Sequence, residues 1–174
     1  MAISDLRDRP DFADTVADRV WRAFWKEAGH PLDLLTGLVR DSLNASSIPT
    51  AFVAHEGLRF LGTASLIVCD EQSRPQYTPW VAALWVEPEH RRRGIGAALV
   101  DAAAEAAFRT GAGRVYLLAR AQRRPFYERL GWSVLEADAP EDGMFILTRD
   151  EGRTQRLAAR SEPGANRRPH QLLR

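Results

Sequence analysis

The sequence is poor in cysteine, in lysine and in long apolar runs. Cys69 is the single cysteine, which excludes an internal disulfide and a cysteine-based zinc site. No segment approaches the roughly 20 uninterrupted apolar residues of a membrane helix, and the N-terminus carries charges where a signal peptide would be apolar. We therefore expect a soluble, cytoplasmic protein without a membrane partner. We also expect no metal, because no two histidines stand at i, i+4 spacing: His30, His55, His90 and His170.

Lys26 is the only lysine, so arginine supplies nearly all the positive charge. The 24 basic residues face 23 acidic ones, a near-neutral balance that does not suit a protein that coats nucleic acid. The length of 174 residues suits one globular domain, which we place at residues 1–149. Residues 150–174 carry six arginines and three acidic residues, a net charge of +3. We expect this tail to be disordered, and a nucleic-acid contact through it is the less favoured alternative.

The spacing of apolar residues predicts an α/β protein, with a mixed sheet of six to seven strands and about four helices. Residues 79–119 read as a strand, a helix and a parallel strand, which together form a right-handed crossover. Residues 1–6 are short and weak as a first strand. The predicted helices are 11–27, 31–44, 95–110 and 125–130, and the predicted strands are 51–55, 60–68, 79–86, 115–119, 132–136 and 144–148.

Three arginines and two glycines precede the predicted helix at residues 95–110, in the order Arg91, Arg92, Arg93, Gly94, Ile95, Gly96. A helix that begins near Ile95 offers unpaired N–H groups to an anion, and glycines let a phosphate approach the backbone. A Walker-type loop needs Gly-Lys-Ser/Thr, which is absent here. A dinucleotide fingerprint needs glycine or alanine where Leu99 stands.

The remaining interpretation is the acyl-coenzyme-A signature, Gln/Arg-x-x-Gly-x-Gly/Ala. On this motif and on the order of its elements, the chain resembles the GNAT superfamily of N-acetyltransferases. The resemblance implies that acetyl-coenzyme A is the co-substrate. It also implies that the two parallel central strands splay apart to admit the pantetheine arm.

The resemblance assigns coenzyme contacts to two short segments. The backbone of residues 92–97, which include Gly94, Ile95, Gly96 and Ala97, would hold the pyrophosphate, while Arg91 and Arg93 add charge. Residues 84–86 would pair with the pantetheine, and a backbone N–H there would polarise the thioester carbonyl; these residues are Leu84, Trp85 and Val86.

A second motif, residues 121–132, looks like the helix-to-strand segment of the same family. Tyr127 matches the tyrosine that the family uses as general acid for the coenzyme thiolate. Phe126 stands beside it as a further coenzyme contact. Arg120 replaces the family's usual asparagine, so one coenzyme contact is expected to differ.

The general base is not identified by the sequence. Some family members carry a glutamate on the central strand, but residues 79–81 here are Pro-Trp-Val. The alternatives are an ordered water or one of four carboxylates: Glu56, Asp70, Glu71 and Glu87. His90, beside the arginines, is expected to be a solvated turn residue.

The sequence thus predicts an N-acetyltransferase that moves an acetyl group from acetyl-coenzyme A to a primary amine of a small molecule or protein. Transfer would be direct, in a ternary complex of a monomer or homodimer. The alternative is a non-catalytic acyl-coenzyme-A sensor or regulatory module.

Overall fold

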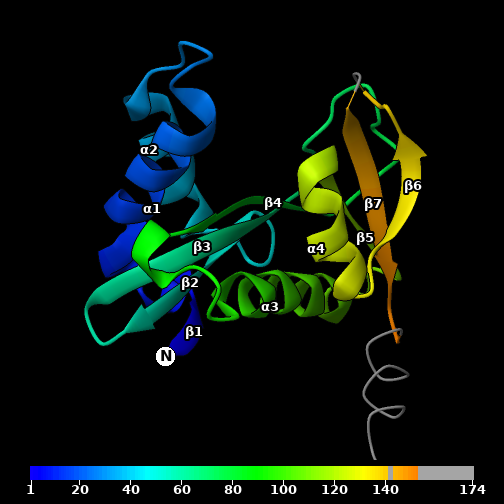
Figure 1. Cartoon of the computed structure of the whole chain (residues 1–174). Helices are drawn as coiled ribbons and strands as arrows, with labels where there is room; N and C mark the ends of the chain where they lie inside the picture. The colour runs from blue at the N-terminus through cyan, green and yellow to red at the C-terminus, as the bar shows by residue number, and fades with distance from the viewer. Residues whose placement is uncertain (141–142, 153–174) are drawn as a thin grey trace, which may run out of the picture.

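One mixed sheet of seven strands organises the molecule (Figure 1). The computed structural model describes residues 1–140 and 143–152. The strand order is β1-β2-β3-β4-β5-β7-β6, and every neighbouring pair is antiparallel except β4 and β5. This architecture confirms the predicted fold class. The strands are β1 Ala2–Asp5, β2 Thr50–Glu56, β3 Arg59–Ile67, β4 Trp80–Val86, β5 Arg114–Arg120, β6 Ser133–Ala137 and β7 Met144–Asp150.

Within the described residues, four α-helices accompany the sheet: α1 Ala13–Val20, α2 Leu32–Ser42, α3 Ile95–Arg109 and α4 Arg124–Arg129. The predicted helix at residues 11–27 is in fact three segments. A 3-10 turn at Pro10–Phe12 precedes α1, and a π-helical turn at Trp21–Trp25 follows it. The apolar spacing could not separate these segments, because each is too short to define its own period.

Two apolar clusters cover the two faces of the sheet. On one face α3 packs through Ala103, Ala104 and Ala107, which are fully buried. Such small side chains let the helix backbone approach the strands closely. On the other face, α1 and α2 pack through a separate cluster that contains Val16 and Leu35. In Figure 1, α3 lies below the sheet, and α1 and α2 lie at the upper left.

The central strands β4 and β5 pair only where β4 begins. Trp80 is the one β4 residue in register with β5, opposite Tyr116, and Tyr116 N donates to Pro79 O at 3.0 Å. Farther along, Ala83 and Leu84 of β4 lie opposite a single residue of β3, and Ala83 has a φ of 51°. This β-bulge turns β4 away from its neighbour. The predicted splay of the parallel strands is therefore confirmed, and burial on both faces is limited to the start of β4.

The ends of the described chain differ in detail from the predicted domain limits. The weak first strand is present as β1, paired with β2. At the other end, β7 continues to Asp150, whose carboxylate pairs with Arg114 at 2.5 Å. The predicted disordered tail lies, from residue 153 onward, outside the described residues. No helix of the described part is both long enough and apolar enough to cross a bilayer.

A substitution at Gly62 of β3 tests how closely β3 and β4 pack next to the bulge. A Cβ at this position would lie 2.6 Å from Trp85 O and 3.2 Å from Val86 Cα, both of them backbone atoms. We expect Gly62→Ala to lower the free energy of unfolding by about 1–3 kcal/mol, because β3 and β4 must separate. Chemical denaturation measures this change.

Gly37 provides the matched control, since it lies exposed in the middle of α2. Apart from its chain neighbours and the backbone of its own helix, no atom of the described residues comes within 4 Å of the place that a Cβ would take there. Gly37→Ala should raise stability by about 0.5–1 kcal/mol through helix propensity. Equal effects of the two substitutions would contradict the packing described for β3 and β4.

Candidate active site

The opening turn of α3 has the features of an anion site. Gly94 precedes the helix with a φ of 79°, and no side chain of the described residues caps the helix. The first helical hydrogen bond runs from Ala98 N to Gly94 O at 3.1 Å. The N–H groups of Ile95, Gly96 and Ala97 therefore lie ahead of the intrahelical ladder, at the positive end of the helix dipole. These N–H groups can donate hydrogen bonds to phosphate oxygens.

Gly96 lies where α3, α4 and β4 meet. A Cβ at Gly96 would lie 3.5 Å from Phe126 Cζ, 3.7 Å from Val86 Cγ2 and 3.8 Å from Leu84 Cδ2. Three of the predicted coenzyme residues thus gather around one glycine. A methyl group here would meet all three side chains at ordinary contact distance, whereas a larger side chain would have to displace them. The first turn of α3 is therefore held close to the end of β4 that diverges from β5.

The three predicted arginines extend to different neighbours. Arg91 Nε donates to Val86 O at 2.9 Å, and its guanidinium lies 4.9 Å from the centre of the Trp85 ring. Arg93 Nη1 lies 3.1 Å from His90 Nδ1. Arg92 is exposed and has a φ of 62°. Two of these side chains therefore anchor the loop, while all three keep positive charge beside the α3 amides.

His90 contradicts the prediction of a solvated turn residue, because only 3% of its surface is exposed. The 3-10 turn Pro88–His90 places the ring between Arg59 Nη2, at 2.7 Å from Nε2, and Arg93. A neutral imidazole can accept at only one ring nitrogen, so one of the two contacts lacks a true acceptor. The sequence could not show this, because Arg59 lies 31 residues earlier in the chain.

Tyr127 lies on α4, half-buried against the same apolar cluster as Leu84 and Val86. Its ring is 5.0 Å from that of Phe126 and 6.4 Å from that of Trp132, measured between centroids. Burial raises the pKa of Tyr127, although the positive charge of Arg123 opposes the shift. The phenol is therefore fully protonated at neutral pH and can give a proton. Arg120, the other predicted residue of this segment, is exposed at the end of β5.

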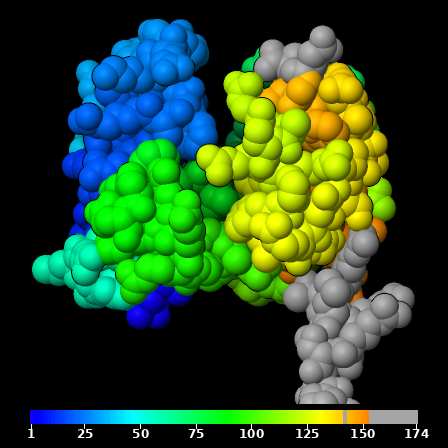
Figure 2. Space-filling model, viewed as in Figure 1, coloured from blue at the N-terminus to red at the C-terminus, as the bar shows by residue number. Residues whose placement is uncertain are grey.

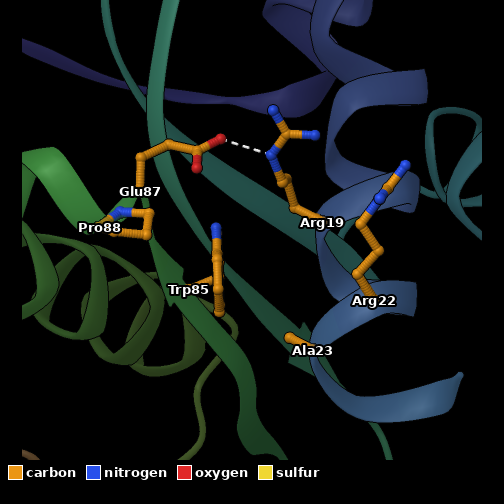
Figure 3. A pocket seen from close by; sticks show the side chains of 6 residues that line it. All are labelled: Arg19, Arg22, Ala23, Trp85, Glu87 and Pro88. Carbon is orange, nitrogen blue, oxygen red and sulfur yellow. Dashed lines mark hydrogen bonds and ion pairs between the residues drawn. The ribbon is translucent and has the colours of Figure 1, made fainter. Parts of the chain in front are cut away.

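A pocket of about 580 Å³ lies between the end of β4 and the helical residues 19–23 (Figure 3). It is on the face of β4 opposite Gly96, because side chains alternate along a strand and Trp85 stands between Leu84 and Val86. Figure 2 shows a hollow in the surface of the molecule. The blue and green residues of α1 and of the loop before α3 lie on one side of it, and the yellow-green residues of α4 lie on the other. Six residues line the pocket: Arg19, Arg22, Ala23, Trp85, Glu87 and Pro88.

Four residues that line the pocket were not predicted from the sequence: Arg19, Arg22, Ala23 and Pro88. Arg19 and Arg22 are three positions apart, a spacing that places them on one side of a helix. Nothing in that spacing indicates which strand the helix meets. Arg19 Nε pairs with Glu87 Oε1 at 2.5 Å, which joins this helix to the residue after β4.

The four candidate bases occupy different places. Glu56 lies at the β2–β3 turn, 3.9 Å from both the N-terminal amine and Arg59, and β3 separates it from β4. Glu71 accepts from Ser73 N at 2.8 Å, and its pKa is lowered mainly by its hydrogen bonds with Ser73. Glu87 lies at the pocket.

Asp70 follows β3, near the start of β4. As a residue it is exposed, yet enough protein surrounds the carboxyl that desolvation, with a smaller contribution from Glu71, raises its pKa to about 6. A carboxylate with this pKa is well suited to accept a proton near neutral pH.

No group of three His, Cys, Asp or Glu side chains within residues 1–140 and 143–152 converges in a way that could hold a metal ion.

Comparison with known proteins relates this geometry to one enzyme family. A model of the acetyltransferase (GNAT) family matches residues 15–132. A GCN5-related N-acetyltransferase from Ralstonia eutropha is 27% identical, with a TM-score of 0.57 over 80% of this chain and 97% of that one. An aminoglycoside 6'-N-acetyltransferase complexed with coenzyme A is 21% identical, with a TM-score of 0.64 over 86% of this chain and 97% of that one. The spermidine/spermine N-acetyltransferase SpeG from Vibrio cholerae, solved in mutant forms, is 15% identical, with a TM-score of 0.62 over 92% of this chain and 99% of that one.

The junction at Gly96 yields a prediction about coenzyme binding. We expect Gly96→Val to weaken the binding of coenzyme A by at least about tenfold, or 1.4 kcal/mol, because the branched side chain must push α3 away from Phe126 and from the end of β4. Isothermal titration calorimetry measures the affinity. Gly96→Ala is the control, since its methyl group meets its neighbours at ordinary contact distance, and it should lose less. If Gly96→Val bound coenzyme A as tightly as the unaltered protein, the coenzyme would not depend on the close packing at Gly96.

Proposed function

The chain belongs to the acetyltransferase (GNAT) family, and from this premise we propose that it transfers an acetyl group directly to a primary amine within a ternary complex. Membership makes acetyl-coenzyme A the co-substrate and the chain an N-acetyltransferase. The observation that carries the proposal is the junction at Gly96, where the uncapped turn of α3 meets Phe126 of α4 and the residues Leu84 and Val86 of β4. Tyr127, the residue after Phe126, is half-buried against the same apolar cluster.

The N–H groups of Ile95, Gly96 and Ala97 bind the pyrophosphate, and Arg92 adds positive charge from the loop. Support comes from the helix geometry, because an uncapped helix start attracts phosphate without any rearrangement. The pantetheine arm then enters the gap where β4 has left β5. Leu84, Val86 and Phe126 supply its apolar walls.

The bulge in β4 polarises the thioester. Ala83 and Leu84 lie opposite one residue of β3, so the regular ladder is interrupted there. A backbone N–H of this segment then donates to the carbonyl oxygen as it gains negative charge. Such fixed donors stabilise a tetrahedral intermediate without reorganising during the reaction.

Tyr127 protonates the departing sulfur. The amine nitrogen attacks the thioester carbon, a C–N bond forms, and the C–S bond breaks as the thiolate leaves. The phenol proton moves to this thiolate and yields free coenzyme A. The raised pKa of Tyr127 keeps that proton available through the neutral range.

One of two carboxylates, directly or through water, takes the proton from the amine. Asp70 is placed near the closed end of the gap, where Trp80 pairs with Tyr116, and Glu87 is placed at the open end. The positions of Glu56, across β3, and of Glu71, held by Ser73, argue against these two. The unusual pKa of Asp70 supports it, while the Arg19 ion pair occupies one oxygen of Glu87.

Removing the Tyr127 hydroxyl tests the acid and also separates an enzyme from a coenzyme sensor. Tyr127→Phe should lower kcat for thiol release by about 10²–10⁴-fold, because the thiolate loses its proton donor. Coenzyme A affinity, followed by calorimetry, should stay within about twofold. Thiol release against a panel of amines is the activity measurement.

Tyr77→Phe is the control, since the Tyr77 hydroxyl is already engaged as a donor to Glu136 at 2.5 Å. This variant should retain its rate. An unaltered protein that binds coenzyme A but releases no thiol with any amine would contradict the proposed turnover and favour the sensor.

The pH dependence identifies the base. If Asp70 accepts the proton, kcat/KM rises about tenfold per pH unit below pH 6 and levels off above it, because only the ionised carboxylate can act. Asp70→Asn should then lower the plateau and remove the bend near pH 6. A bend that survives in Asp70→Asn and disappears in Glu87→Gln would assign the role to Glu87.

A further inference from the structure

We propose that the pocket beside Trp85 binds a carboxylate group of the acceptor, so that the amine substrate is a carboxylate-bearing amine such as an amino acid or short peptide. This inference rests on the proposed function and names the class of its acceptor. It depends on which charged atoms of the pocket are already paired and which remain available (Figure 3).

The carboxylates around the pocket are occupied by arginines. Asp18 Oδ1 accepts from Arg22 Nε at 2.8 Å, and Asp18 Oδ2 accepts from Arg19 Nη1 at 2.5 Å. Glu87 Oε1 accepts from Arg19 Nε at 2.5 Å, and the Glu87 side chain is only 13% exposed. A cationic acceptor would therefore meet carboxylates that are already neutralised.

Arg22, unlike these carboxylates, keeps hydrogen-bond donors that a ligand can use. Its Nε is paired with Asp18, but a guanidinium carries five N–H donors in a fork that matches a carboxylate. The Arg22 side chain is 62% exposed at the pocket. Its Nη groups can therefore receive an anion without breaking the existing ion pair. Because Asp18 fixes one edge of the guanidinium, less side-chain entropy is lost when the ligand binds.

Trp85 adds a flat wall and a further positive charge. The Arg91 guanidinium lies 4.9 Å from the centre of its ring. Arg19 and Arg22 line the pocket, and Arg91 adds a third positive charge next to it, against the two carboxylates of Asp18 and Glu87. Among the described residues, Trp85 Nε1 is a buried donor with no hydrogen-bond partner. The local charge and the spare donors both favour an anionic ligand with an apolar portion.

The place of the pocket suits an acceptor. Trp85 follows Leu84 directly, so the pocket begins one residue beyond the bulge that polarises the thioester. It lies on the face of β4 opposite Gly96, and therefore opposite the proposed path of the coenzyme. The gap between the splayed strands joins the two faces. An acceptor held by its carboxylate at Arg22 can then direct its amine through the gap.

Paired acceptors test this proposal. Each amino acid or dipeptide is compared with its own C-terminal carboxamide, and spermidine is added as a polycationic acceptor without a carboxylate. Thiol release with acetyl-coenzyme A gives kcat/KM for each. We expect each acid to exceed its amide by at least about tenfold, the size of one charge-assisted hydrogen bond. Arg22→Gln should raise KM for the acid by a similar factor and so bring it to the level of the amide.

Arg40→Gln is the matched control, because Arg40 is also 62% exposed and pairs with an aspartate, but on α2 and away from the pocket lining. It should leave the preference for acids intact. Calorimetric binding of the same acids and amides to the coenzyme A complex provides a readout that does not need turnover.

If acids and amides bind and react equally, or if spermidine is the preferred acceptor, the proposal of a carboxylate subsite is wrong, but the proposal of acetyl transfer is not affected. If no acceptor causes thiol release, the proposal of acetyl transfer is contradicted, and the binding measurements still test the carboxylate subsite. An acid preference that Arg22→Gln leaves unchanged also overturns the proposal.

Discussion

The bulge in β4 is the constraint on which the rest of the site depends. Trp80 still pairs with Tyr116, so the two parallel strands are joined at one end. Past that point Ala83 adopts a left-handed backbone conformation and β4 follows β3 instead of β5. A regular ladder would have closed the sheet and buried both faces of β4. The interruption exposes backbone groups at the centre of the sheet, where a ligand can replace the missing strand contacts.

The anion site depends on this geometry through α3. The buried alanines of α3 allow close approach to the sheet, which brings its first turn beside the diverging end of β4. The loop before the helix is held from two directions, by Arg91 on Val86 O and by His90 between Arg59 and Arg93. The amides are therefore positioned before any ligand arrives, which reduces the entropy that binding must overcome. The arginines that indicated a phosphate site in the sequence also serve this structural purpose.

The sequence was informative where a local pattern determines a local structure. The glycines and arginines at residues 91–96 predicted the helix opening, and strand-helix-strand order predicted the parallel pair. The sequence did not predict contacts between residues that are far apart along the chain. His90 is buried by Arg59 from the β2–β3 hairpin, and Arg19 reaches Glu87 across 68 residues. Neither contact follows from residue spacing, because each depends on how α1 and β3 pack against β4. The π-helical turn was missed since five residues cannot establish a period.

Alternation along β4 gives each proposed substrate site its own face of one strand. Leu84 and Val86 face Gly96, whereas Trp85 between them faces the pocket of Arg19 and Arg22. In a strand, a shift of one residue exchanges the two faces completely. The extra residue at Ala83 therefore has two effects: it opens the gap, and it sets which side chains beyond it face the proposed coenzyme site and which face the proposed acceptor site. Because the two sites share this backbone, a change that closed the bulge would disturb both together, while a side-chain change on either face would affect mainly one.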